Sequence, residues 1–358
     1  MYMDDEIKSE VMKVLDSGYY IKGPNLKAFE ENFKKYLNVK YSIGVSSGTA
    51  ALFLAYNELK LSSGDEVIMP SHTFLATASP LAFFGAKPIF VDVNPETYCL
   101  DIEDLKEKIT PKTRCITPVH LYGHPADMNP ILEIAKDHDL KVIEDACQAH
   151  GAEYKGRKVG SIGDIGIFSF FPSKNMTVGG DGGMIVTNND KYGELLSVRR
   201  DHGRTTKYRN DNLGLNFRLN EIQAAIGKLQ LKHLDEWVSI RREYARKYNE
   251  IFKNYSEVKT PIEKDGVKHS YYVYTIQMDE RDKFIDYFQE KRIATGLYYP
   301  IPVHKQPVIE KIYGKQPKLP ITEEIVNKIV SLPLSSQLTS EEFERIKLEI
   351  NNYMRGVK

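Results

Sequence analysis

Three short segments in the first half of the chain carry residue types that can do chemistry together. The segment SSGT at residues 46–49 joins an apolar run to a helical pattern. Small residues at such a junction leave backbone N–H groups free to bind an anion at the positive end of a helix. Asp145 follows a second apolar run, and Lys174 follows the aromatic segment FSFFPS. These positions predict an anion cradle, a carboxylate and an amine.

Each segment has a functional interpretation and a purely structural one. A phosphate could rest on Gly48 and Thr49, or the turn could be an ordinary helix cap. Asp145 could point into the crevice at the carboxyl ends of strands, where open α/β sheets bind ligands, or could itself cap a helix. Aromatic neighbours would desolvate Lys174 and make it a better nucleophile, unless it is simply an exposed loop lysine. The hydroxyl of Ser169 could join the anion site.

Taken together, the three segments match one cofactor. Pyridoxal phosphate (PLP) needs a lysine for its Schiff base, a carboxylate that holds its pyridinium nitrogen protonated, and a cradle for its phosphate. Lys174, Asp145 and the segment around Gly48 supply these groups in the order cradle, carboxylate, lysine along the chain. The sequence therefore predicts a PLP site.

Short apolar runs alternate with helical patterns around these segments. The expected strands are Tyr41–Val45, Glu66–Met69, Pro88–Val91, Arg114–Val119, Lys141–Glu144, Ile165–Phe170 and Met184–Thr187. Continuous apolar strands separated by helices are typical of a mostly parallel sheet covered on both faces. We expect an α/β fold with seven strands in a large domain, residues 1–240, which also contains an N-terminal helix.

The last third of the chain has a different pattern of expected strands and helices. Strands are expected at Ser270–Gln277 and Thr295–Tyr299, and helices at Arg281–Lys291, Glu323–Ser331 and Ser340–Met354. A further helix is expected at Phe74–Phe84 in the large domain. The mixture predicts a smaller α+β domain at residues 241–358.

Composition excludes several classes of protein. The chain has 358 residues, 41% hydrophobic and 27% charged, with 49 basic and 49 acidic side chains, which argues against a disordered chain or a nucleic-acid binder. Three cysteines without CxxC pairs argue against a disulfide framework and a structural zinc site, so no metal is expected. The acidic start MYMDDE and the lack of a long apolar run argue against a secretory signal and a membrane span. We expect a cytoplasmic protein.

The order of motifs resembles a known family, the nucleotide-sugar aminotransferases of the DegT/StrS (DegT/DnrJ/EryC/StrS) type. The resemblance covers almost the whole chain, through SSGTAAL, PSHTFLATA, HLYGHPADM, EDACQAHGA, SFFPSKN, GDGGM, LNFRLNEIQAAIG and YYPIPVHKQP. It implies the PLP-dependent transferase fold type I, that of aspartate aminotransferase. It also implies transfer of an amino group, in most relatives from glutamate, to a keto sugar on a nucleotide.

The resemblance also assigns roles to individual positions. It implies that Lys174 binds the cofactor and moves the proton, and that Asp145 pairs with the pyridine nitrogen. The other implied cofactor contacts are Gly48, Thr49 and Ser169 at the phosphate, Phe74 against the ring, Gln148 near the phenolic oxygen, and Asn216 reaching the phosphate of a neighbouring subunit. The last assignment implies a homodimer with shared active sites.

Substrate residues and competing functions are less constrained. His304 lies where the family approaches the sugar nucleotide, Tyr298 could line the same pocket, and Arg218 could reach the diphosphate; each could instead be structural, as could Phe74. A sugar dehydratase of this fold has histidine at the lysine position, so Lys174 argues against it. A non-catalytic regulatory protein is the second alternative, although every expected catalytic position is filled. The nucleotide, the sugar and the choice between C3 and C4 stay open.

Overall fold

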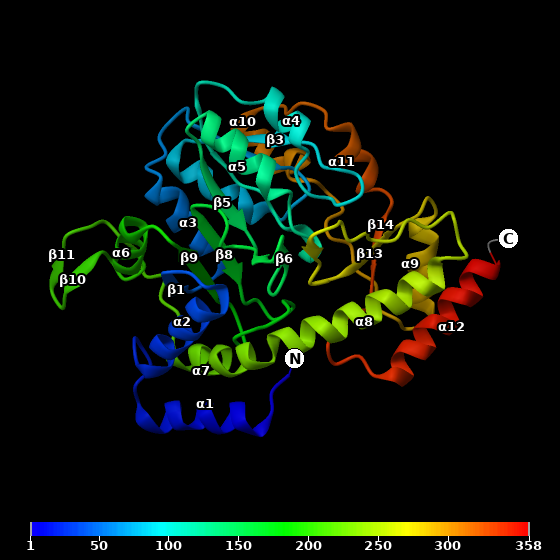
Figure 1. Cartoon of the computed structure of the whole chain (residues 1–358), viewed down its shortest axis with the longest axis horizontal. Helices are drawn as coiled ribbons and strands as arrows, with labels where there is room; N and C mark the ends of the chain where they lie inside the picture. Colours follow the sequence, from blue (N-terminus) through cyan, green and yellow to red (C-terminus); the bar gives the residue numbers. More distant parts are fainter. Residues whose placement is uncertain (1, 357–358) are drawn as a thin grey trace.

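The computed structural model describes residues 2–356 and is built on one seven-stranded sheet (Figure 1). Its strands are β1 (Tyr41–Val45), β2 (Glu66–Pro70), β3 (Lys87–Val91), β4 (Thr113–Ile116), β5 (Lys141–Asp145), β8 (Ile165–Ser169) and β9 (Gly183–Thr187). Their order is β1-β9-β8-β5-β4-β2-β3, and β9 alone among them runs antiparallel to its neighbours. The predicted α/β fold with a mostly parallel, seven-stranded sheet is confirmed.

Helices cover both faces of this sheet. One face packs against α2 (Pro24–Leu37), α5 (Met128–Asp137) and α7 (Glu221–Gln230), and the other against α3 (Gly48–Glu58) and α6 (Asp190–Arg199). Each face of the sheet has its own hydrophobic core, and alternate residues of a strand are buried in opposite cores, as Val142 and Ile143 of β5 are. Burial on both faces explains why the strands read as unbroken apolar runs. Two more elements flank this body, α1 (Asp5–Ser17) against α7 and α4 (Ile102–Glu107) near α5.

The long helix α8 (Leu234–Phe252) leads from the sheet to the C-terminal part of the chain (Figure 1). Its first turns, with Trp237 and Val238, belong to the core of the large sheet, whereas Tyr244 and Tyr248 belong to a separate core. That second core contains β13 (Tyr274–Gln277) paired with β14 (Ile329–Leu332), and the helices α9 (Arg281–Glu290) and α12 (Ser340–Gly356). We propose that the smaller domain begins inside α8, near residue 241.

The chain returns once from the smaller part to the large sheet. Val303, Ile309 and Leu319, in and around α10 (Pro307–Tyr313), are buried in the same cluster as α3. The helix α11 (Pro320–Ile325) follows, and the carboxylate of Asp92 accepts hydrogen bonds from its Ile321 and Thr322 backbone N–H groups at 2.9 and 2.7 Å. The segment between α9 and β14 therefore ties the two cores together.

Two expected helices are wrong in part. Phe74–Phe84 forms two short 3₁₀ helices, η1 (Leu75–Thr77) and η2 (Ser79–Phe84), because Pro80 lacks an N–H and disfavours helical geometry in the residue before it. The expected helix Glu323–Ser331 ends as α11 at Ile325, and its second half is strand β14. A short apolar run such as this has no period that separates a strand from a buried helix.

Two expected strands are also shorter than predicted. β13 begins at Tyr274 rather than Ser270, because Ser270 and Tyr272 donate their backbone N–H groups to Gly123 and Tyr122 of the large domain instead. Within Thr295–Tyr299, only Gly296 pairs with a strand, through Ser331. Both departures come from contacts between segments far apart in the sequence.

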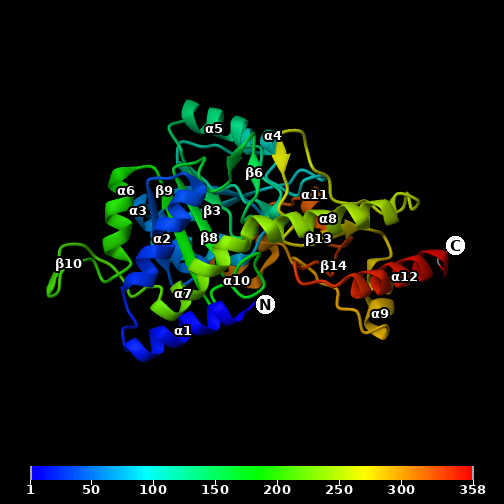
Figure 2. The same ribbon diagram turned by 60° about the horizontal axis from the view of Figure 1, so that its bottom comes forward.

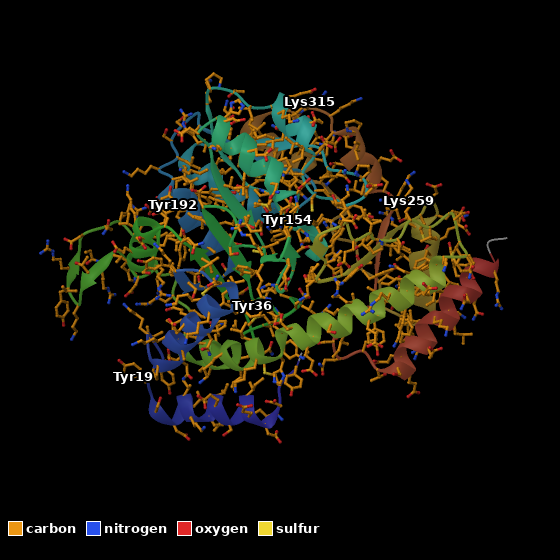
Figure 3. All side chains as sticks on the ribbon, in the orientation of Figure 1. Tyr19, Tyr36, Tyr154, Tyr192, Lys259 and Lys315 are labelled. Carbon is orange, nitrogen blue, oxygen red and sulfur yellow. The ribbon has the colours of Figure 1, made fainter. Side chains whose placement is uncertain are left out.

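A hairpin of β10 (Arg204–Thr206) and β11 (Arg209–Asn210) projects far from the rest of the molecule in both views (Figures 1 and 2). A three-stranded sheet is formed by β12 (Val267–Lys268), β6 (Glu153–Tyr154) and β7 (Arg157–Lys158), and Lys158 of this sheet pairs with Asp235 of α8 at 3.5 Å. Tyr36 of α2 lies near the start of α8 (Figure 3) and donates a hydrogen bond to Asp235 at 2.6 Å. Within residues 2–356 we find no helix with the length and apolarity needed to cross a lipid bilayer.

Candidate active site

The predicted anion cradle lies where α3 begins. The side chain of Ser47 caps the helix by accepting the N–H of Ala50 at 3.0 Å. A Cβ atom at Gly48 would lie 2.9 Å from Cβ of Ser169 and 3.1 Å from Sγ of Cys147, so only glycine lets the helix approach β8 this closely. The helix N-terminus and the Ser169 hydroxyl therefore lie together, as an anion site requires.

Asp145, the last residue of β5, is buried with its carboxylate held at both oxygens. The Thr77 hydroxyl donates to Oδ2 at 2.8 Å, and the backbone N–H of Cys147 donates to Oδ1 at 3.2 Å. Only 5% of Asp145 is exposed. These bonds orient a negative charge at the carboxyl edge of the sheet, where a cationic ring nitrogen can pair with it.

Gln148 is oriented by two neighbours. Its Oε1 accepts the backbone N–H of Tyr122 at 2.8 Å, so its Nε2 faces the Tyr299 hydroxyl, to which it donates at 3.0 Å. The ring of Tyr299 lies 5.5 Å from that of Phe74, which is 56% exposed. Burial raises the pKa of Tyr299 above its usual value, so this hydroxyl is neutral. Phe74 and Gln148 thus border the same space from two sides.

Lys174 is half-buried, and its Nζ lies 4.4 Å from the centre of the Tyr272 ring. The nearby imidazole of His150 lies between Phe168 and Phe170, with neither ring nitrogen in a hydrogen bond. Burial, and secondarily the charge of Lys174, lowers the pKa of His150 to about 3, so this imidazole is neutral. The charge of Lys174 also acts on Cys147, which borders both Gly48 and Asp145.

These contacts bring the predicted cradle, carboxylate and amine into one site. Cys147 connects them, since it adjoins Gly48, bonds Asp145 through its N–H and lies within reach of the Lys174 charge. A glycine-shaped cradle, a fixed carboxylate and a primary amine are the donor set that PLP requires. The residues present therefore fit this cofactor. Within residues 2–356 there is no cluster of three or more His, Cys, Asp or Glu side chains that could hold a metal ion.

Two predicted residues, Asn216 and Arg218, flank Phe217, whose carbonyl accepts the backbone N–H of Ser46 at the start of the cradle segment at 2.8 Å. Asn216 is exposed and pairs through its backbone with Asp201. Arg218 donates from Nη1 to Oδ1 of Asp201 at 2.8 Å, and Lys22 donates to the other oxygen at 2.8 Å. Arg218 thus has a structural partner, Asp201 of the same chain.

His304 and Tyr298 are held by protein contacts. Nδ1 of His304 lies 2.5 Å from the Ser71 hydroxyl and Nε2 lies 3.2 Å from Glu323, while 2% of the residue is exposed. Burial lowers the pKa of His304. A direct hydrogen bond to a substrate would require one of these contacts to break. Tyr298 is half-buried, and its carbonyl accepts a hydrogen bond from the Tyr122 hydroxyl.

Comparison with known proteins identifies the chain. Residues 1–351 match the DegT/DnrJ/EryC1/StrS aminotransferase family. The chain belongs to this family. It is 42% identical over 353 residues, 99% of this chain and 96% of the other, to the dTDP-3-amino-3,6-dideoxy-alpha-D-galactopyranose transaminase of Aneurinibacillus thermoaerophilus. It is 43% identical over 321 residues, 88% of this chain and 86% of the other, to a pleiotropic regulatory protein of Geobacillus stearothermophilus.

Solved structures agree with this assignment. The Streptomyces venezuelae protein DesV, in complex with a ketimine intermediate, superposes with a TM-score of 0.94 at 36% identity, over 98% of this chain and 94% of DesV. The Bacillus subtilis protein NtdA, with bound cofactor PMP, gives 0.91 at 33% identity, over 98% and 82%. This member of the DegT family is therefore a nucleotide-sugar aminotransferase with fold type I and PLP as its cofactor, as the motifs predicted.

Several residues of the site had no strong signal in the sequence. Thr77 lies in a segment with a helical pattern, and short hydroxyl residues are common in any turn. Tyr272 is 98 positions beyond Lys174, and Tyr122 acts through its backbone N–H. Glu144 precedes Asp145 and could have been noted as a buried acid at a strand end. The aminotransferase site thus depends on groups that only the folded chain brings together.

Glu144 anchors the strand that carries Asp145. Its carboxylate accepts the N–H groups of Gly160, Ile162 and Gly163 at 2.8, 2.6 and 2.6 Å, and Nε2 of His120 at 3.0 Å. Burial alone would raise its pKa, but the bond from His120 and the backbone N–H groups hold the pKa below its usual value. Glu144 is fully buried, so every one of these donors depends on it.

Replacing Glu144 with alanine is expected to destabilise the protein by about 3–5 kcal/mol, because it removes the acceptor of buried His120, of two buried backbone N–H groups and of the partly buried N–H of Gly163. Chemical denaturation of the native and variant chains at equal cofactor saturation measures this difference. The matched control is Glu103→Ala on α4, whose side chain is exposed and pairs with Lys106, and which should leave the unfolding midpoint almost unchanged. Equal midpoints for both variants would contradict the anchoring role.

Proposed function

We propose that this aminotransferase moves an amino group from L-glutamate to carbon 3 of a keto sugar linked to dTDP. The observation that carries the choice of sugar is the 42% identity to a 3-amino-sugar transaminase over 99% of the chain. Tyr272 and Tyr298 line a cavity beside Ser173, the neighbour of Lys174, and the Tyr299 hydroxyl accepts a hydrogen bond from Gln148 at 3.0 Å. Hydroxyl-bearing rings suit a sugar, since they offer both an apolar face and a hydrogen bond.

The cofactor, when bound, supplies an electron sink for the carbanion formed at the amino carbon. Lys174 is the chain's own base in this proposal. Its amine can take the proton from that carbon and then donate it to the cofactor. Its half-buried position keeps it accessible to a substrate while water is partly excluded. No other lysine amine neighbours Asp145 or Cys147 among the contacts of the described chain.

Asp145 has an electrostatic role in the same proposal. A carboxylate beside the ring nitrogen favours the protonated ring, and a protonated ring accepts electrons more readily. The hydrogen bond from Thr77 and the N–H of Cys147 fix the direction of this carboxylate before any substrate arrives. Ser169 and the N-terminus of α3 would hold the phosphate, which would keep the ring nitrogen close to the Asp145 carboxylate.

We further propose that two copies of the chain form a homodimer with shared active sites. Tyr208 and Leu213 of the projecting segment are 86% and 90% exposed, and Leu215 beside Asn216 is 44% exposed. Phe83, 79% exposed, adjoins a cluster of rings made by Phe53, Phe84 and Phe217. Exposed apolar groups gathered over neighbouring elements are typical of a protein interface. Asn216, lying among them, would face the cofactor phosphate of the partner.

A reducing, cytoplasmic setting is part of the proposal. Cys99, Cys115 and Cys147 are free thiols, and none forms a disulfide with another described cysteine. Two of the three are buried in the core of the large domain, where burial raises the pKa of each thiol to about 12. Such thiols are inert packing groups, as is usual in reducing compartments.

A coupled assay tests the reaction. With glutamate as donor and a panel of 3-keto and 4-keto sugars on dTDP, UDP and GDP, release of 2-oxoglutarate should be fastest with a dTDP-linked 3-keto sugar. We expect a preference of roughly 10- to 100-fold over the 4-keto isomer, the size that one or two misplaced hydrogen bonds produce. Faster turnover of a 4-keto sugar would contradict the choice of carbon, and faster turnover with another amino acid would contradict the donor.

A further inference from the structure

The contact between Lys174 and Tyr272 joins the two parts of the molecule at the reacting amine. Nζ of Lys174 lies 4.4 Å from the ring centre, within the range of a cation–π interaction. We propose that the face of Tyr272 is the binding site for the ammonium of Lys174, and that it holds this group whenever the lysine is not attached to the cofactor. The proposal deepens the proposed function, on which its catalytic meaning rests.

The Tyr272 ring is fixed at its far end and along its backbone. Its hydroxyl lies 2.9 Å from the hydroxyl of Ser173, the neighbour of Lys174. Its backbone N–H donates to the carbonyl of Tyr122 at 2.8 Å, and that of Ser270 donates to Gly123 at 2.9 Å. The loop of the smaller domain is thereby docked, backbone to backbone, on a loop of the large domain. Displacing the loop from Lys174 would break these backbone bonds, and turning the ring away would break its bond to Ser173.

Both docked loops contain strained tyrosines. Tyr122 has φ 59° and Tyr271 has φ 45°, in the left-handed region that bulky residues rarely adopt. Gly123 has φ 96°, and a Cβ there would meet Oγ of Ser270 at 2.5 Å and the backbone nitrogen of Tyr271 at 2.9 Å. Strain of this kind persists only where surrounding contacts impose it, and it clusters at functional sites. The N–H of strained Tyr122 donates to Gln148, and the ring over Lys174 belongs to Tyr272, the residue after strained Tyr271.

A buried arginine holds the smaller-domain loop in place. Arg241 of α8 donates from Nη1 to the carbonyls of Tyr271, Tyr272 and Leu334 at 3.3, 3.1 and 3.0 Å. It is 6% exposed, and its hydrogen bonds go to these carbonyls rather than to a carboxylate. Burial lowers its pKa to about 10, so it remains charged at neutral pH. Arg241 is a positioning residue, because it acts on Lys174 only through the Tyr272 loop.

The other groups that face Lys174 do not compete for this charge. Burial keeps His150 neutral and the thiol of Cys147 protonated, and Tyr299 is neutral for the same reason. The Asp145 carboxylate is engaged by Thr77 and by the N–H of Cys147. The Tyr272 face is the group of the described chain with a recorded contact to the Lys174 ammonium. An aromatic face at this distance favours the ammonium form of a lysine over its free amine.

The test measures this pH directly. The full chain is loaded with pyridoxamine phosphate, which leaves Lys174 as a free amine, and is treated briefly with acetic anhydride at a series of pH values. Peptide mass spectrometry gives the extent of acetylation of Lys174. A cavity of about 280 Å³ lined by Ser173, Tyr272 and Tyr298 gives the small reagent access to this edge. The midpoint of the acetylation curve reports how strongly the site holds Lys174 as its ammonium.

Removing the ring should lower this midpoint. We expect Tyr272→Leu to lower it by about 0.4 to 1.5 pH units, the equivalent of a 2- to 30-fold change in proton affinity. Tyr272→Met, which fills more of the space, should give the same shift if the leucine variant does not fold. Tyr272→Phe and Ser173→Ala keep the aromatic face and should stay within about 0.2 units of the native midpoint.

A matched control lies on the far side of the smaller domain. Tyr287→Leu removes another ring that has a lysine 5.2 Å from its centre, Lys291, and should leave the midpoint of Lys174 unchanged. An unchanged midpoint in both Tyr272→Leu and Tyr272→Met would overturn the proposal, as would a shift in Tyr272→Phe as large as in Tyr272→Leu. Neither outcome depends on turnover. A failure of the proposed sugar or donor in the coupled assay would leave the midpoint result intact.

Discussion

A Lys174→Ala chain is expected to fold and to lose transamination by about 10²- to 10⁴-fold or more, the contribution of a positioned general acid–base group. Lys174 is half-buried at the edge of the site, so its removal leaves no unpaired charge in the core. The cradle at Gly48, the Ser169 hydroxyl and the Asp145 carboxylate all remain. The variant should therefore keep the cofactor noncovalently while the proton transfer has no base.

Borohydride reduction of the native holoenzyme, followed by peptide mapping, should find the pyridoxyl group on Lys174. The variant should show no reduced adduct, although an absorbance spectrum after gel filtration should still reveal bound cofactor. Lys106→Ala is the matched control, because Lys106 is an exposed lysine on α4 that pairs with Glu103. An adduct on a different lysine of the native chain, or near-native turnover by Lys174→Ala, would contradict the assignment.

The sheet and the centre of the site could be predicted from the sequence for the same physical reason. Strands buried on both faces must be apolar throughout, so β5 and β8 are visible as short runs such as Val142-Ile143 and Ile165–Phe168. Polar residues that follow such runs emerge at the ligand-binding edge of the sheet. Asp145 and Lys174 are such residues, and their chemistry is evident from their types.

The second layer of the site depends on long-range packing that leaves no local pattern. Thr77, which donates to Asp145, ends a short 3₁₀ helix where the sequence suggested one regular helix through Phe84. Tyr272 reaches Lys174 because its loop bonds to the large domain and not to β14. His304 looked like a substrate ligand from its position, yet its contacts with Ser71 and Glu323 appear only in the folded chain. The pattern and periodicity of apolar residues predict which positions are buried, but they do not predict which residues far apart in the sequence come into contact.

Mixing two inactive variants is expected to restore about a quarter of native activity. The variants are Lys174→Ala and Asn216→Asp, the second of which would place a carboxylate against the cofactor phosphate. If sites are shared across a two-fold axis, a mixed dimer has one site with both defects and one with neither. Equal amounts with free exchange make half of all dimers mixed, and half of their sites are native, so recovery should approach about a quarter.

The matched control mixes Lys174→Ala with Asp145→Asn. Asp145 and Lys174 of one chain belong to the same active site, where Cys147 connects them. Mixing these two variants therefore cannot produce a site in which both residues are native. Every site of that mixed dimer carries one defect, and no activity should return. The two mixtures therefore differ only in whether the second residue belongs to the same half of the site as Lys174.

Asn216 is well placed for such a test because its side chain is exposed in the single chain and its substitution removes no core contact. It lies beside Leu215 and the projecting hairpin, whose exposed apolar residues a partner would cover. Cofactor and dimer should also stabilise one another, since a ligand held by both chains binds the dimer and not the monomer. Exchange is checked by mass spectrometry of differently tagged chains. If mixed dimers form and no activity returns, each chain builds its site alone and Asn216 belongs to the surface.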